Sequence, residues 1–209
     1  LFNKAIPPKP IGEAWLVSDH PVHESVITNG PLAGQTLREI IQRDSQAVLG
    51  ARPQLTHSGR FPLLLKILDA AQVLSVQVHP DDACAERLGE PDVGKTEMWH
   101  VLQADPGSEL ICGLDTSVTP DNVRSAIEQN TLENLMNRYP VHEGTSILLP
   151  AGTIHAIGAG IVLAEIQQNS DLTYRLYDWG RLDDSGQPRQ LHIDKAMEAI
   201  QFHFQQKIH

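Results

Sequence analysis

Cysteine is scarce in this chain of 209 residues, which has only Cys84 and Cys112, in unrelated contexts and without a CxxC spacing. A chain of this length can bury a sizeable core without cross-links. No secretory hydrophobic segment lies near the start of the sequence. We therefore expect the reducing cytoplasm as its compartment.

Basic residues and long apolar runs are also lacking. The chain has 16 Lys and Arg against 26 Asp and Glu, a formal net charge of −10 at pH 7. That sign disfavours nucleic acid and anionic membranes as partners. No segment approaches the roughly 20 apolar residues that a membrane span requires. We expect neither partner, and an anionic ligand would have to be met by a few local basic groups.

Short β-branched or Leu-rich runs, separated by Gly and Pro, make up most of the sequence. They lie at 61–68, 73–79, 96–102, 109–114, 145–152, 153–158, 161–168 and 172–179. Such spacing predicts an antiparallel sandwich or barrel. No repeat or linker divides the chain, so we expect a single domain over residues 1–209.

Three segments carry helix signals. Residues 36–50 place Glu39 three positions after Thr36 and close on Gly50, which is typical of a capped amphipathic helix. Residues 119–138 open with Thr-Pro and predict a two-helix insertion. A last helix is expected at 193–201.

Several predicted strands carry polar residues on one face. Side chains alternate along a strand, so Ser75, Gln77 and His79 share a face. The same parity groups Lys95 with Glu97 in the next polar strand. Each of these residues alone could serve a solvated, paired or hydrogen-bonded role.

A barrel could bring several of these groups to one point. His155, in the strand that follows a Pro-Ala-Gly turn, adds a second imidazole to that of His79. Two imidazole nitrogens with the Glu97 carboxylate and the Gln77 amide oxygen would suit Zn, Mn or Fe(II), with a position left open for water or substrate.

A second constellation pairs Glu165, in an apolar run, with Arg175 ten residues later. Burial tends to raise the pKa of a Glu, the condition for acid/base work near neutrality. A buried Arg needs an anion, either a protein carboxylate or a ligand phosphate. The alternative is structural, with Glu165 and Arg175 paired to each other or to Asp178.

Taken in order, five segments resemble the type I mannose-6-phosphate isomerases (phosphomannose isomerases), zinc enzymes of the cupin superfamily, in their compact bacterial form. They are IGEAWLVSDHP, NGPLAGQTLREII, FPLLLKILDAAQVLSVQVHPDD, GKTEMWHVL and LPAGTIHAIGAGIVLAEIQQNSDLTYRLYDWGR. The resemblance implies a mainly β, cupin-type double-stranded β-helix (jelly-roll barrel) with an inserted helical segment and flanking helices. It implies a metal-dependent aldose–ketose isomerase that interconverts mannose 6-phosphate and fructose 6-phosphate through a cis-enediol, with one Zn²⁺ per chain.

The same resemblance assigns residues. The family's zinc ligands match Gln77, His79, Glu97 and His155, and its substrate-site residues match Ser75, Lys95, Glu165 and Arg175. Trp15 and Glu13 would lie near the site mouth. Glu165 is the expected acid/base, while Arg175, with Lys95 and Ser75, would hold either the phosphate or the enediolate.

Two alternative functions follow from the same residues. One is a metal-dependent cupin oxygenase using Fe(II), and the other is a non-catalytic sugar-phosphate-binding cupin. Family members usually extend further at both ends, so we expect this chain to be truncated relative to them, with substrate enclosure affected more than metal binding. The sequence specifies no oligomeric state.

Overall fold

The computed structural model describes residues 11–202 apart from 52–54, 57 and 183–184. The principal strands are β1 Glu13–Val17, β4 Leu63–Ala70, β5 Val76–Val78, β6 Glu97–Ala104, β7 Glu109–Leu114, β8 Met136–Pro140, β9 Ser146–Leu149, β10 His155–Ile157, β11 Ile161–Gln168 and β12 Tyr174–Tyr177. A short hairpin joins β2 Asp19–His20 to β3 His23–Glu24. The helices are α1 Leu37–Leu49, α2 Asp82–Arg87, α3 Pro120–Glu128 and α4 Ile193–Ala199, with 3₁₀ turns at Gly30–Leu32 and Leu132–Leu135.

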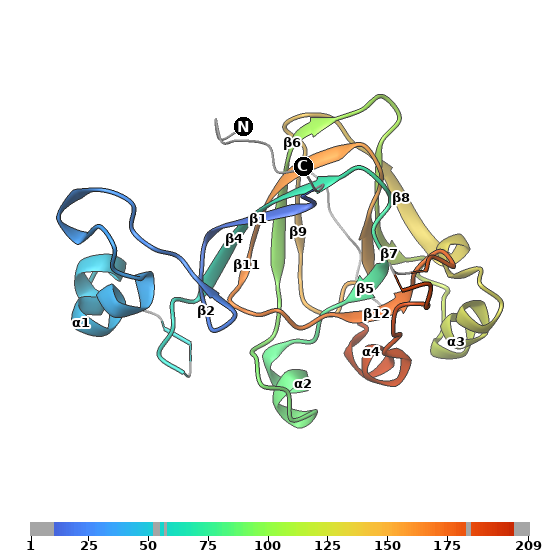
Figure 1. The fold of residues 1–209 in the computed structure, drawn as a ribbon. Coiled ribbons are helices and arrows are strands. Elements are labelled where there is room, and N and C mark those ends of the chain that lie inside the picture. The colour runs from blue at the N-terminus through green and yellow to red at the C-terminus, as the bar shows by residue number, and fades with distance from the viewer. Residues whose placement is uncertain (1–10, 52–54, 57, 183–184, 203–209) are drawn as a thin grey trace.

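Two five-stranded antiparallel sheets form the walls of a barrel (Figure 1). The first sheet has the order β1-β4-β11-β6-β9 and the second has the order β12-β5-β10-β7-β8. The predicted mainly β, cupin-type jelly-roll barrel is therefore confirmed. Each of the eight predicted strand runs contains or overlaps a strand, and β1, β8 and the short β2–β3 hairpin are additional to them.

The apolar residues form two layers. One cluster fills the barrel between the sheets and includes Trp99, Leu110 and Leu163. The other joins the outer face of the second sheet to helices α3 and α4, and it includes Val76 and Val78. Alternation along β5 therefore packs these two valines under the helices and leaves the residue between them facing the barrel interior.

Helix α1 has the predicted ends. Thr36 and Glu39 form a reciprocal capping box, and Gly50 follows the last turn with a φ of 82°. The backbone leaves helical geometry at Asp44, so the helix is kinked. Figure 1 shows α1 well away from the barrel, on the side of β1 and β4.

The prediction of two helices over 119–138 is wrong in its second half. Helix α3 ends before Asn130, whose φ of 55° is incompatible with a continuing helix. A 3₁₀ turn follows, and then β8 pairs with β7. The apolar spacing after Asn130 arises from a turn leading into a strand rather than from a second α-helix.

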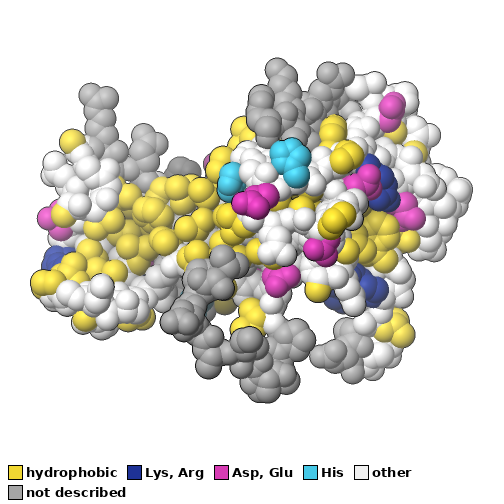
Figure 2. All heavy atoms as spheres, turned by 90° about the horizontal axis from the view of Figure 1, so that it is seen from above, with side chains coloured by type: hydrophobic (Ala, Val, Ile, Leu, Met, Phe, Trp, Pro, Cys, Tyr) yellow, Lys and Arg dark blue, Asp and Glu magenta, His cyan; other side chains and the backbone are white. Residues whose placement is uncertain are grey.

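The outer face of the first sheet keeps several apolar side chains exposed, namely Leu63, Met98, Leu148 and Ile166. Figure 2 shows hydrophobic side chains gathered between the barrel and the α1 end on one face of the molecule. Among the described residues, no helix is long and apolar enough to span a bilayer.

Candidate functional site

Strand register places the polar residues of both sheets inside the barrel. In the second sheet, Gln77 lies opposite Arg175 on one side and His155 on the other. In the first sheet, Glu165 lies opposite Lys66 on one side and Trp99 on the other. Residues that are paired across neighbouring strands point to the same face of their sheet. The polar residues of the two sheets therefore form two rows that face each other across the barrel.

Three of the four predicted metal ligands meet directly. Ligand atoms of His79, Glu97 and His155 all lie within 4.8 Å of one another. His79 Nε2 is 3.3 Å from Glu97 Oε1, and His155 Nε2 is 3.5 Å from Glu97 Oε2. Each of the three residues is 1% exposed. The cluster is thus held in a dry interior.

Backbone carbonyls orient both imidazoles. His79 Nδ1 donates to the Leu172 carbonyl at 2.7 Å, and His155 Nδ1 donates to the Thr153 carbonyl at 2.9 Å. A carbonyl can only accept, so Nδ1 carries the proton in both rings and Nε2 presents a lone pair toward Glu97. This is the arrangement in which a neutral imidazole binds a metal.

The electrostatics favour unprotonated ligands. Burial lowers the pKa of His79 to about 4, with nearby Lys95 acting in the same direction. Burial likewise lowers the pKa of His155. Burial opposes ionisation of Glu97, but Lys95 and His79 outweigh it and hold the pKa of that carboxyl well below its usual range.

Gln77 is the fourth member. Its amide nitrogen donates to His155 Nε2 at 3.4 Å. The side chain therefore lies at the edge of the His79, Glu97 and His155 cluster, where its amide would have to turn for the oxygen to face a metal.

Glu165 is buried beside this cluster. It is 3% exposed, and Trp99 Nε1 donates to its Oε2 at 2.8 Å. Burial, reinforced by the Glu97 charge, raises the pKa of Glu165 to about 7. A carboxyl with this pKa can both give and take a proton near neutrality.

Two buried lysines face these carboxylates. Lys95 Nζ is 3.0 Å from Glu97 Oε1. Burial opposes its charge, but Glu97 and then Glu165 outweigh that effect and raise the pKa of Lys95. Lys66 Nζ lies 4.0 Å from Glu165 and 3.7 Å from Glu13. Sequence reasoning missed Lys66, although a lysine inside the apolar run LLLKIL is itself a signal of a buried charge.

Arg175 lies at the other end of the site. Its Nε donates to Ser75 Oγ at 3.3 Å, and its Nη1 donates to the Gln190 carbonyl at 3.0 Å. Asp178, named as a possible partner, instead accepts from Arg181 and Arg189. Burial and the neighbouring Arg189 lower the pKa of Arg175, which still leaves a charged guanidinium.

Many of the site residues, though not His79, Glu97 or His155, border one cavity of about 440 Å³. Its lining runs from Glu13, Lys66 and Glu165 to Ser75, Gln77, Lys95, Arg175 and Arg189. Trp15 stands at this rim, with Lys66 Nζ 4.7 Å from its ring centroid and Glu13 accepting its indole N–H. Arg189 and His192, which accepts the Arg175 backbone N–H, are further site residues that sequence reasoning missed.

Known proteins are similar to this chain in sequence. Residues 1–99 match the family model described as phosphomannose isomerase type I, catalytic domain. A mannose-6-phosphate isomerase of Streptococcus mutans is 42% identical over 200 residues, and one of Bacillus subtilis is also 42% identical over 200 residues.

A solved structure agrees with these relatives. The crystal structure of a mannose 6-phosphate isomerase from Bacillus subtilis superposes with a TM-score of 0.88 and 37% identity, covering 99% of this chain. The chain spans 61% to 64% of the length of these three relatives.

Proposed function

We propose that this chain, which is similar to type I mannose-6-phosphate isomerases in sequence and fold, interconverts mannose 6-phosphate and fructose 6-phosphate with one bound Zn²⁺. The observation that carries the proposal is the buried group of His79, Glu97 and His155, next to the cavity that Gln77, Lys95 and Glu165 line. An acid/base that moves the proton and a positive centre that stabilises the enediolate oxygens suit an aldose–ketose isomerisation.

The donor set fits a metal ion. His79 Nε2 and Glu97 Oε2 are buried without a hydrogen-bond partner among the described residues, a costly arrangement unless something binds them, while Glu97 Oε1 has Lys95 Nζ at 3.0 Å. Two imidazoles, a carboxylate and the Gln77 amide oxygen suit Zn²⁺. Structures of the same fold, 19% to 20% identical, are described as zinc-bound. A bound Zn²⁺ would supply positive charge toward the sugar oxygens.

The protein's own groups would move the proton. In an aldose–ketose isomerisation a proton passes between C1 and C2 of the open-chain sugar through a cis-enediol. Glu165 would act as the acid/base, because its raised pKa suits both directions of transfer. The buried ammonium groups of Lys66 and Lys95 would stabilise negative charge that develops on the sugar oxygens.

The phosphate would bind at the Arg175 end. Three guanidinium groups, those of Arg175, Arg181 and Arg189, gather there around one carboxylate, that of Asp178. The local excess of positive charge suits a dianion, and Arg is well shaped for phosphate. Ser75, which accepts from Arg175, adds a hydroxyl on the same wall.

Phosphorus NMR of the purified chain with mannose 6-phosphate tests the proposal. We expect fructose 6-phosphate to form, conversion to stop after chelation and zinc to restore it. Stoichiometric iron with oxygen uptake would point to the oxygenase alternative. Sugar-phosphate binding without turnover in the zinc-loaded chain would point to the non-catalytic alternative.

A further inference from the structure

The ring of His79 is held from behind by a single turn of chain. Its Nδ1 donates to the Leu172 carbonyl at 2.7 Å. Leu172 closes the turn 169–172 between β11 and β12. Because a hydrogen bond behind a ligating imidazole fixes the ring orientation, whatever holds this turn also acts on the metal site.

Ser170 fixes the turn from inside. Its side chain is buried, with 0% of the residue exposed. The hydroxyl donates to the Val93 carbonyl at 2.7 Å and accepts the Leu172 N–H at 3.3 Å. Loss of the hydroxyl would therefore leave two backbone groups without this partner in a place that water does not reach.

Asp92 fixes the turn from the next position. Its Oδ2 accepts the Asp171 N–H at 3.0 Å and lies 2.9 Å from His20 Nε2. Asp92 and Val93 belong to the segment that joins α2 to β6 and leads directly into Lys95 and Glu97. Two hydrogen bonds thus tie the turn behind His79 to the segment that delivers Glu97.

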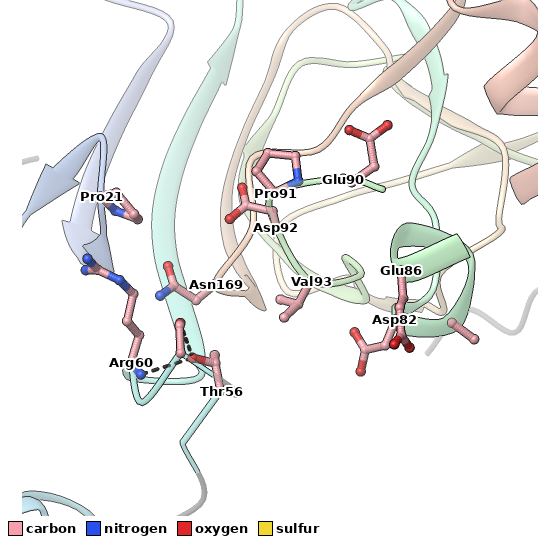
Figure 3. A pocket seen from close by; sticks show the side chains of 12 residues that line it. Pro21, Thr56, Arg60, Asp82, Glu86, Glu90, Pro91, Asp92, Val93 and Asn169 are labelled. Atoms are coloured by element: carbon pink, nitrogen blue, oxygen red, sulfur yellow. Dashed lines mark hydrogen bonds between the residues drawn. The ribbon is translucent and has the colours of Figure 1, made fainter. Parts of the chain in front are cut away.

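This junction borders a second cavity, of about 710 Å³. Figure 3 shows Asp92, Val93 and Asn169 close together in the lining of this cavity. The cavity leaves the outer side of the junction open.

We propose that Ser170 and Asp92 are positioning residues of the metal site. They hold turn 169–172 so that the Leu172 carbonyl keeps His79 Nε2 directed at Glu97 and His155. The inference rests on the proposed metal-dependent function. A turn that can shift would let the His79 ring rotate. Zinc binding would then have to fix the ring orientation, which costs free energy.

Zinc affinity of the 209-residue chain, measured by competition with a chelator, tests the inference. We expect Ser170→Ala to weaken zinc binding by about tenfold or more, the effect typical of groups behind metal ligands. Ser108→Ala is the matched control, because Ser108 is also buried and its hydroxyl donates to the Ala159 carbonyl at 2.8 Å in a different turn. We expect Ser108→Ala to bind zinc within about twofold of the parent chain.

Asp92→Ala provides a second variant from a less buried position, since the Asp92 side chain is 21% exposed. It should weaken zinc binding severalfold, and Asp92→Asn, which keeps an acceptor for the Asp171 N–H, should recover much of the loss. Parent-like affinity in Asp92→Ala and in any folded Ser170→Ala overturns the inference, as does an equal loss in Ser108→Ala. A parent chain that binds no zinc overturns the proposed function, and this inference with it.

Discussion

Glu165 is the single residue on which the proposed chemistry depends most. Its Oε2 accepts the Trp99 indole N–H, so Gln can occupy the same place and keep that hydrogen bond. We expect Glu165→Gln to bind zinc normally and to lose turnover by about a hundredfold or more. Measurement of kcat and zinc content on one preparation checks this. Near-parental kcat would remove Glu165 from the acid/base role.

The same substitution should change stability in a pH-dependent way. The pKa of Glu165 in the folded chain is raised to about 7 from an ordinary value of 4.5, so the folded state binds the proton more tightly than the unfolded state. Its contribution is therefore favourable below about pH 4.5 and is lost as pH rises toward 7. Metal-free Glu165→Gln should melt above the parent at pH 8 and gain little at pH 4.5. Equal differences in Tm at both pH values would contradict the raised pKa.

Lys66 should affect the pKa of the Glu165 carboxyl. Its ammonium, 4.0 Å away, favours the charged form of Glu165 and so lowers its pKa. With Lys66→Met we expect the pKa of Glu165 to rise, so that the base-dependent limb of the pH–rate profile moves to higher pH. Activity at pH 7 should fall by about tenfold.

Lys195→Met is the matched control for Lys66→Met. Its side chain is 49% exposed and pairs with Glu90 rather than with the site. The base-dependent limb of the pH–rate profile should keep its position in Lys195→Met. If this limb also stays in place in Lys66→Met, Lys66 has no electrostatic role at Glu165.

Among the elements, the segment between α2 and β6 has little room to change. A Cβ on Gly94 would lie 2.5 Å from the Asp82 backbone nitrogen and 2.8 Å from Asp81 Cα. Backbone cannot yield as a side chain can, so Gly94→Ala must displace the segment that carries Lys95 and Glu97. We expect a loss of stability of about 2 kcal/mol or more, together with weaker zinc binding.

Gly12→Ala is the control for Gly94→Ala, because its Cβ would approach nothing closer than the Asp69 carbonyl at 4.0 Å. Denaturant unfolding and zinc titration of both variants check the prediction. A Gly94→Ala chain with parental midpoint and zinc affinity would show that the segment tolerates displacement.

Most of what the sequence could predict about the strands came from the alternation of side chains between the two faces of each strand. Because Gln77 and His79 lie two apart in an apolar run, a common inward face followed from strand geometry alone. Helix α1 was predictable for a similar local reason, its capping box. β8 was not, because the spacing of Leu132, Leu135 and Met136 fits a helix, and only pairing with β7 decides for a strand.

Contacts that depend on the pairing of strands far apart in the sequence could not be predicted. Lys66 lies opposite Glu165, about a hundred residues later in the chain, through the β4–β11 register. The turn behind His79 likewise depends on Ser170 and Val93 meeting across the fold. Neither contact has a local signal, whereas the four predicted ligands lie in motifs that the family resemblance could locate.

For the molecule as a whole, metal binding should act as a stabiliser. An ion that binds only the folded chain adds about 4 kcal/mol at a thousandfold excess over its Kd. Chelation should therefore lower Tm, and zinc should restore it. Because the pKa of His79 is lowered to about 4, protons compete for this ligand only near that pH, and the zinc-dependent rise in Tm should persist at pH 5.5. A rise already lost at pH 6 would indicate ligands of ordinary pKa, which are exposed rather than buried.

We propose that one metal ion binds where the two polar rows meet. Anomalous diffraction at the zinc edge from crystals of the zinc-loaded chain is the sharpest test. We expect one strong peak within coordination distance of His79, Glu97 and His155, with the Gln77 amide turned toward it. No peak there, or a single peak bound by other residues, would show that the metal site lies elsewhere or does not form.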